Sequence, residues 1–306
     1  MVDRIRKALD LARMQRAQGE PLARLDRGAV AELAVELEQE LPGPALPEEH
    51  HAATVDGAPP EQKAAKSQAL RPLASIVYSR TRVFAPAAEH LERNRILNPA
   101  ASEAAAAAYR MLRTQVLQRM DAHGWRSLAI FSARAEDGKT TTAINLAASV
   151  ASDHLHTVLL VEFDLRRPRL AAHFGFSPQY GVDDALHERA SLEQCLHHPE
   201  GFDRLVLLPA RARLGNSSEI LAGPKSRELV ASLRFRYPER VIIYDLPPVL
   251  NADDALSFAP LVECGLVVAA EGRTRRDDLR RTIELLNKTP LVGTVLNRAA
   301  DAPPGY

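Results

Sequence analysis

The chain has 306 residues, which is enough for one large α/β domain with an extension or for two domains. Its 39 basic and 39 acidic residues cancel, so no overall positive charge attracts nucleic acid, and we expect no nucleic-acid partner. No apolar run approaches the roughly 20 residues of a membrane span, and the charged N-terminus lacks a secretory signal pattern. Cys195 and Cys264 form no metal or redox motif, which is typical of buried thiols in a reducing cytosol. We therefore expect a cytoplasmic protein.

The first hundred residues are predicted to lie outside the main domain. Residues 1–41 are predicted to form an N-terminal helical segment, and the thin apolar stripe of its first helix, 1–20, fits either a contact with an anionic membrane or partner, or a solvated helix. Residues 42–100 are predicted to be a flexible linker and short extension, because a Pro-, Ala- and Glu-rich stretch cannot bury enough apolar surface to fold. Within it we expect a short extended segment in 75–84 and a short helix in 86–95.

Residues 101–300 are predicted to form the main domain, followed by a C-terminal tail at 301–306. It opens with a long helix over 102–120. Each predicted strand is a continuous apolar run, as in strands covered on both faces. The fold class is therefore α/β, with a doubly wound, mostly parallel sheet that binds ligands at the carboxyl ends of its strands. Strands are expected at 127–132, 157–163, 204–208, 240–245, 265–270 and 292–297, and helices at 139–152, 225–236, 253–259 and 275–288.

A phosphate-binding loop is predicted between strand 127–132 and the helix that begins at Lys139, which makes the sheet one of the P-loop NTPase type. Backbone N–H groups of such a loop converge at the positive end of the helix dipole and favour polyphosphate. Lys139 can reach the β- and γ-phosphates, and the Thr140 hydroxyl can hold Mg²⁺. The predicted nucleotide-binding residues of the loop are Ala133, Arg134, Ala135, Glu136, Asp137, Gly138, Lys139, Thr140 and Thr141.

The loop departs from the common pattern in two places. Ala133 stands where glycine is usual, and Ala135-Glu136-Asp137 lies where such loops often need glycine for a positive φ. Two carboxylates that face a site for triphosphate are electrostatically unfavourable unless a cation intervenes. We therefore expect tight nucleotide binding to require Mg²⁺.

Carboxylates are predicted to meet this loop from two strands. Side chains at i and i+2 of a strand point the same way, so Glu162 and Asp164 should project together. There they can hold Mg²⁺, orient a nucleophile or accept a proton from a hydroxyl; the alternative is an acidic strand end paired with Arg166 and Arg167. Asp245 ends another apolar strand, and a carboxylate at this place holds Mg²⁺ directly or through water.

These motifs together resemble the cytoplasmic tyrosine autokinases and chain-length regulators of bacterial capsule and exopolysaccharide synthesis. The resemblance covers about residues 100 to 300, in the family's order. It is carried by Tyr109-Arg-Met-Leu-Arg-Thr-Gln115, the Gly-Lys-Thr loop, Val161-Glu-Phe-Asp-Leu-Arg-Arg-Pro168, Tyr244-Asp-Leu-Pro-Pro248 with Asp253-Asp254 after it, and Val295-Leu-Asn-Arg298.

The resemblance implies ATP and Mg²⁺ as cofactors and transfer of the γ-phosphoryl group to tyrosine hydroxyls. It also implies a membrane polysaccharide co-polymerase, or chain-length determinant protein, as the partner. That partner would bring the chain to the inner face of the plasma membrane; self-association into a homo-oligomer is a further implication. The implied catalytic residues are Lys139, Glu162, Asp164 and Asp245, the metal site is Thr140, Asp164 and Asp245, and Asn297 with Arg298 falls where related ATPases touch the base.

The chain departs from the family at several of these positions. Glu162 takes the place of an aspartate with a base-like role and is one methylene longer. Ala107 replaces the glutamate that precedes Arg110 and Arg113 in the family's assembly helix, and Tyr306 stands where the family has a tyrosine cluster.

Two alternatives to a kinase therefore stay open. One is an ATP-binding regulatory partner of a polysaccharide co-polymerase with little or no kinase activity. The other, weaker one is a partition- or septum-type ATPase switch, which would carry a lysine where this chain has Arg134.

Two further polar clusters carry no predicted site. His187, His197 and His198 lack ligand spacing and are predicted to be solvated helix and loop residues. Arg273-Thr-Arg-Arg276 is interpreted as a surface cluster at a helix start, offset by Asp277-Asp278.

Overall fold

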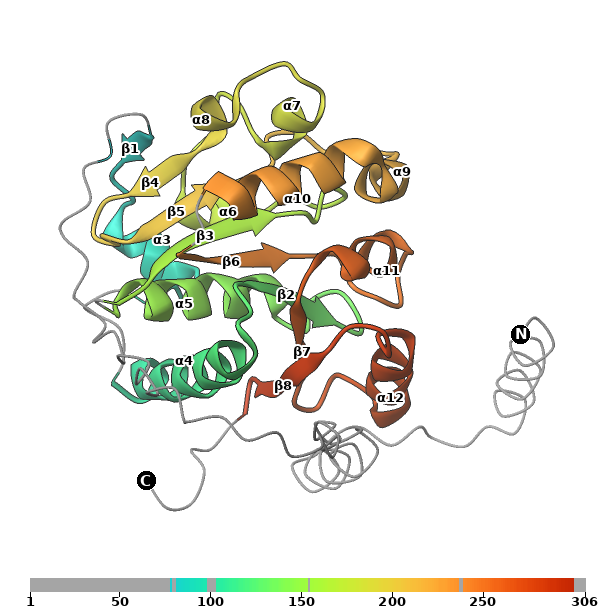
Figure 1. Cartoon of the computed structure of the whole chain (residues 1–306). Coiled ribbons are helices and arrows are strands. Elements are labelled where there is room, and N and C mark those ends of the chain that lie inside the picture. The colour runs from blue at the N-terminus through green and yellow to red at the C-terminus, as the bar shows by residue number, and fades with distance from the viewer. Residues whose placement is uncertain (1–77, 79–80, 98–102, 154, 237–238, 300–306) are drawn as a thin grey trace, which may run out of the picture.

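The computed structural model describes residues 78, 81–97, 103–153, 155–236 and 239–299 (Figure 1). The predicted N-terminal helical segment, most of the predicted linker and the C-terminal tail lie outside these residues. In the described part of the chain, no helix combines the length and apolarity that crossing a membrane requires.

Within the described residues, the fold is organised on one eight-stranded sheet in the order β1-β4-β5-β3-β6-β2-β7-β8. Neighbouring strands run parallel except β4 and β5, which are antiparallel. The strands are β1 Arg82–Phe84, β2 Ser127–Ser132, β3 Thr157–Glu162, β4 His197–Pro199, β5 Leu205–Leu208, β6 Arg240–Asp245, β7 Cys264–Ala270 and β8 Leu291–Asn297.

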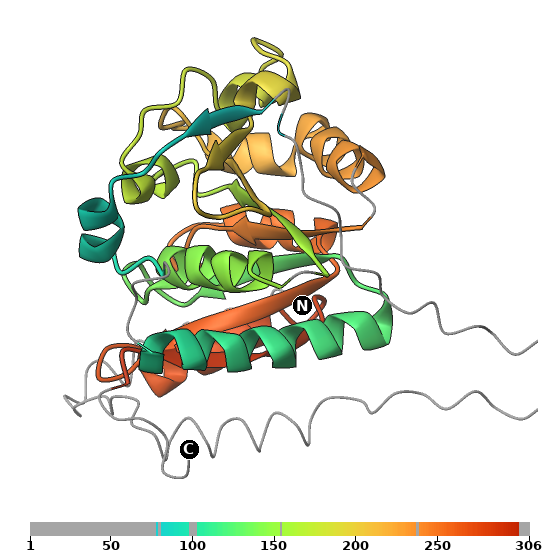
Figure 2. The same cartoon turned by 90° about the vertical axis from the view of Figure 1, so that its left-hand side faces the viewer.

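Helices cover both faces of this sheet (Figures 1 and 2). One face is covered by α3 Ala88–Arg93, α4 Glu103–His123, α5 Lys139–Ala151 and α6 Leu170–Phe174. The other is covered by α7 Val182–Leu186, α8 Leu192–Cys195, α9 Ser217–Ala222, α10 Pro224–Arg236, α11 Asp254–Phe258 (continued by a 3₁₀ turn at Ala259–Leu261) and α12 Arg276–Leu285. The predicted doubly wound, mostly parallel sheet is confirmed.

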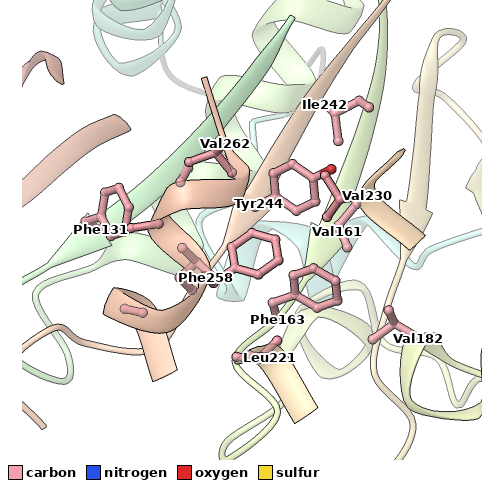
Figure 3. Close-up of a cluster of buried hydrophobic side chains, with 14 of the residues drawn as sticks. Phe131, Val161, Phe163, Val182, Leu221, Val230, Ile242, Tyr244, Phe258 and Val262 are labelled. Atoms are coloured by element: carbon pink, nitrogen blue, oxygen red, sulfur yellow. The ribbon is translucent and has the colours of Figure 1, made fainter. Parts of the chain in front are cut away.

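The core explains why the strands are continuous apolar runs. Successive side chains of a strand point to opposite faces, so Leu128 and Ile130 of β2 pack in one layer while Ala129 and Phe131 pack in the other. Both layers are covered by helices, and all four side chains are fully buried. In the layer shown in Figure 3, the rings of Phe163 and Phe258 pack edge to face, with 4.7 Å between their centroids and an interplanar angle of 72°.

The stretch predicted as a linker and short extension also contributes to this fold. β1 forms the last three residues of the expected extended segment, and the expected short helix is confirmed as α3. β1 pairs in parallel with β4, and Leu91 of α3 is buried in the layer formed by α4, α5 and α6. The division of the chain into domains stays a prediction, but the described residues of this stretch belong to the sheet.

The prediction that His197 and His198 are solvated is wrong. Both lie in β4, are buried and donate from Nδ1 to backbone carbonyls, those of Cys195 and Leu205. The strand has only three residues, too few for a periodic pattern. His187 is exposed as predicted.

The two cysteines match their predicted state. Cys195 and Cys264 are both free and buried. Burial raises the pKa of each thiol to about 12, so neither is a reactive thiolate at neutral pH.

Candidate functional site

The site forms where three neighbouring parallel strands end at one edge of the sheet. β6 lies between β2 and β3, and Asp245 at its end is in register with Ile130 of β2 and Glu162 of β3. The loop after β2 and the loop after β3 therefore meet on either side of Asp245. This is the edge at which open α/β sheets bind ligands.

Lys139 is the centre of this edge. Its Nζ lies 2.9 Å from Asp164 Oδ2 and 3.5 Å from Asp245 Oδ1, and it donates to Thr140 Oγ1 at 3.2 Å. The side chain is buried, and burial alone lowers its pKa. The carboxylates of Asp245 and Asp164 outweigh that effect and raise the pKa above the usual value, so Lys139 is a fixed cation.

Thr140 and Asp245 form the second contact of this cluster. The Thr140 hydroxyl donates to Asp245 Oδ2 at 2.6 Å, and Asp245 Oδ1 is buried without a hydrogen bond. Burial raises the pKa of Asp245, which Lys139 and Thr140 counteract. A hydroxyl and two carboxylates are hard oxygen donors of the kind that Mg²⁺ takes together with phosphate oxygens and water. The donor set of Thr140, Asp164 and Asp245 therefore fits Mg²⁺.

The backbone of the loop is held in an unusual conformation. Glu136 has φ +68° and Gly138 has φ +96°. The expectation that this stretch demands a positive φ is confirmed, and a non-glycine residue meets the demand at Glu136. A Cβ added to Gly138 would lie 1.8 Å from Asn297 Nδ2. Glycine is therefore required at 138 both for its backbone angle and for the close approach of Asn297.

Arg134 and Asp137 tie the first half of the loop to the fold. Arg134 forms a two-point ion pair with Asp278 of α12, at 2.6 and 3.0 Å. The buried Asp137 accepts a hydrogen bond from the Arg134 amide at 2.9 Å. Burial raises the pKa of Asp137, and that amide bond opposes the rise.

Glu136 is held by two arginines that follow β7 and β8, the strands on one side of β2. Its carboxylate pairs with Arg273 at 2.7 Å, and its backbone carbonyl accepts from Arg298 at 3.0 Å. Asn297 Nδ2 donates to the carbonyl of Asp137 at 3.0 Å. Asn297 and Arg298, predicted to touch the base, thus lie against the loop itself.

Glu162 has different partners from Asp164. Its Oε1 accepts from the amides of Arg169 and Leu170, the latter at 2.7 Å, and its Oε2 accepts from the amide of Ala210 at 2.9 Å. Burial raises the pKa of Glu162 to about 7 although these three N–H groups lower it. The carboxyl group links the start of α6 to the chain that leaves β5.

The arginines that follow β3 do not neutralise these acids with their side chains. Arg166 pairs with the fully buried Asp254 at 2.9 Å, and Ser217 also donates to Asp254. Arg167 contributes its backbone amide to Asp164 at 3.1 Å. The alternative of an acidic strand end paired with Arg166 and Arg167 side chains is therefore not what forms.

The contacts of several residues at this edge of the sheet are not predicted by the sequence. From the sequence, Asp278 and Arg273 are expected to be surface charges, and Asp254 is only part of a motif. They meet their partners across 88 to 144 positions of the chain. No local periodicity reports such contacts.

Comparison with known proteins gives a consistent set of relatives. No protein-family model matches the chain. It is 28% identical over 191 residues to the tyrosine-protein kinase YwqD of Bacillus subtilis, covering 62% of this chain and 79% of that protein. It is 31% identical over 181 residues to the succinoglycan biosynthesis transport protein ExoP of Rhizobium meliloti, covering 56% of this chain but only 22% of that longer protein. Among solved structures, the kinase domain of VpsO is 32% identical, with a TM-score of 0.57 and coverage of 64% of this chain and 95% of that one.

Proposed function

The chain belongs to the family of bacterial tyrosine-protein kinases, and we propose that it is an ATP- and Mg²⁺-dependent protein-tyrosine kinase of exopolysaccharide or capsule synthesis. The single observation that carries the proposal is the buried cluster of Lys139, Thr140, Asp164 and Asp245 behind a loop with Gly138 at φ +96°. This arrangement places a fixed cation and a set of magnesium ligands at one point of the sheet edge.

Each member of the cluster has a proposed task. Lys139 neutralises the β- and γ-phosphates of ATP, and the backbone amides of the loop orient them. Thr140, Asp164 and Asp245 would hold Mg²⁺, which would neutralise part of the phosphate charge. Gly138 lets the backbone approach the phosphates closely. ATP turnover without an acceptor is the expected side activity of such a site.

Glu162 is the proposed general base for the tyrosine hydroxyl. Near neutral pH, a carboxyl group with a pKa of about 7 is partly deprotonated and is more basic than an ordinary carboxylate, as a general base requires. To act, Glu162 would have to exchange one of its backbone hydrogen bonds for the tyrosine hydroxyl.

The test is phosphotyrosine formation with Mg²⁺ and ATP, compared between the wild type and Lys139→Met. We expect phosphotyrosine on the protein or on tyrosine-rich peptides in the wild type and none in the variant. Circular dichroism of both proteins must show the same fold, because Lys139 also neutralises buried carboxylates. A folded wild type that binds ATP and yields no phosphotyrosine would overturn the proposal.

One observation favours a second candidate function, a regulatory ATP-binding partner with little or no kinase activity. Both carboxyl oxygens of Glu162 already accept hydrogen bonds from backbone N–H groups. Neither oxygen is therefore free to accept the proton of a tyrosine hydroxyl. Calorimetry that finds ATP binding without any phosphotransfer would favour this candidate.

The proposed partner is a membrane polysaccharide co-polymerase. ExoP, a similar protein, is named for transport in succinoglycan biosynthesis, which supports a place beside such machinery. We propose that the partner recruits the chain to the inner face of the plasma membrane. Co-purification with a co-polymerase from the same organism would test this.

A further inference from the structure

A small cavity lies beside the candidate site and is lined in part by the segment that follows β3. It has a volume of about 260 Å³ and is lined by Pro168, Arg169, Ala171, Phe176, Pro178 and Arg211, among others. Pockets for drug-sized ligands usually exceed about 300 Å³. The size and the partly apolar lining, to which Pro168, Phe176 and Pro178 contribute, therefore suit one side chain better than a whole small molecule.

The cavity is structurally coupled to Glu162. The carboxyl group of Glu162 accepts from the amides of Arg169 and Ala210, which both line the cavity. Asp164, which holds Lys139, lies five residues before Arg169, so at most about 18 Å of chain separates the two. A peptide seated in the cavity can thus reach the phosphate site within a few residues.

The rim of the cavity is positively charged. Arg169 and Arg211 line it, and Arg211 is paired with Asp184 at 2.8 Å. Leu214 donates to the carbonyl of Leu165 at 2.9 Å, so the arginine before it, Arg213, borders the loop that carries Arg167. Arg167, Arg169 and Arg213 are exposed and form no ion pair within the ranges that the structure describes.

From these observations the geometry points to an acceptor-docking site: the cavity takes an apolar side chain of an acidic peptide segment, and Arg167, Arg169 and Arg213 bind carboxylates on either side of it. The inference rests on the proposed kinase function, because it names the class of tyrosine substrate. The acceptor tyrosine lies within a few residues of the docked side chain. Acidic segments are favoured by charge, and basic segments are repelled.

Peptide binding without nucleotide tests this inference separately from catalysis. The probe is a fluorescein-labelled peptide with a leucine to dock in the cavity, Asp or Glu on both sides of it and Phe at the acceptor position a few residues away, measured by fluorescence anisotropy. A second peptide carries Asn and Gln at the acidic positions. We expect the wild type to bind the acidic peptide at least about tenfold more tightly, with an advantage that shrinks as salt rises.

Variants then locate the site. Arg169→Glu should weaken binding of the acidic peptide about tenfold, because an attraction becomes a repulsion. Arg227→Glu makes the same charge change on α10, on the opposite face of the sheet, and should bind as the wild type does. Both should bind Mg²⁺-ATP normally in calorimetry.

The outcomes are decisive in either direction. Equal binding of the two peptides by the wild type, or equal weakening in both variants, would overturn the inference. The comparison of the two peptides needs only the wild type, so misfolding of Arg169→Glu would not rescue it. Peptide binding that survives in a protein without kinase activity would contradict the proposed function and leave the docking site standing.

Discussion

Lys139 and Asp164, 25 positions apart in the chain, form a buried ion pair with 2.9 Å between Nζ and Oδ2. Asp245 completes it from the neighbouring strand at 3.5 Å. The Lys139 ammonium group thus neutralises two carboxylates in a buried site. The pair lies at the proposed phosphate site, and removing its cation would leave buried carboxylates uncompensated.

We predict that Lys139→Met lowers the free energy of unfolding by about 3 kcal/mol near neutral pH, because it leaves two buried carboxylates without a cation. The loss should shrink in acid, because burial raises the pKa of Asp245 and protonation removes its charge. Urea unfolding of both proteins across pH measures this. Lys139→Arg keeps the charge and is the control; a Lys139→Met protein as stable as the wild type would contradict the prediction.

Gly138→Ala should damage both the loop and nucleotide binding. The new Cβ would lie 1.8 Å from Asn297 Nδ2 at a φ of +96°, so the loop or Asn297 must move. We expect a loss of about 2–4 kcal/mol in stability and a clear loss of ATP affinity in calorimetry. Gly215→Ala is the matched control, since its Cβ meets nothing within 4 Å.

A double variant separates the two causes. Asn297→Ala in the Gly138→Ala background removes the clash and leaves the backbone strain. Partial recovery of stability is the expected result. No recovery at all would show that the contact with Asn297 is unimportant.

Sequence patterns predicted the parts of this site that depend on local structure. The apolar runs gave β2 and β6 with the bounds observed, and the Gly-Lys-Thr junction placed the start of α5 at Lys139. Burial on both faces leaves a continuous apolar signal that a single strand carries by itself.

What sequence patterns missed depends on contacts between distant residues. β3 ends at Glu162, so the two-residue alternation does not extend to Asp164, and the two carboxyl groups take different partners. Glu136 pairs with Arg273 across 137 positions, which no local pattern reports. The short β4 and α6 to α9 carry too few residues for a periodic signal.

Glu162 gives the stability of the protein a distinct pH dependence. Its pKa is about 7 in the folded protein and near the ordinary value of 4.5 when unfolded. The folded state therefore holds the extra proton between these values, so this contribution is present in acid and is lost as pH rises through about 7. The shifted pKa of Glu162 changes the free energy of unfolding by up to about 3 kcal/mol across this pH range.

We therefore predict that Glu162→Gln is less sensitive than the wild type to a rise in pH between about 5 and 8. Urea unfolding at both ends of that range measures the difference. Phosphotransfer by the same variant should fall if Glu162 is the base. Parallel stability curves for the two proteins would refute the titration assigned to Glu162.

Titration of His197 should change the stability of the protein with pH in the opposite direction to Glu162. Burial lowers its pKa, with the nearby Arg82 adding to the effect and the Cys195 carbonyl opposing it. The folded state keeps the ring neutral, so stability falls as pH drops below the unfolded pKa of about 6.5. His197→Phe, which can keep the contact with Phe176, should remove this part of the acid sensitivity in the same unfolding experiments.

Magnesium should be required for tight ATP binding. The positive charge of Lys139 is already shared by Asp164 and Asp245, so a triphosphate arriving alone meets two buried carboxylates. The acids of the loop add less to this repulsion than their number suggests, because Glu136 is paired with Arg273 and Asp137 accepts from the Arg134 amide.

We expect ATP affinity in calorimetry to fall at least about tenfold in excess chelator, which corresponds to about 1.4 kcal/mol. Asp245→Asn removes one of the repelling charges and should narrow the difference between the two conditions. Equal affinity of the wild type with and without chelator would mean that Thr140, Asp164 and Asp245 do not hold the metal.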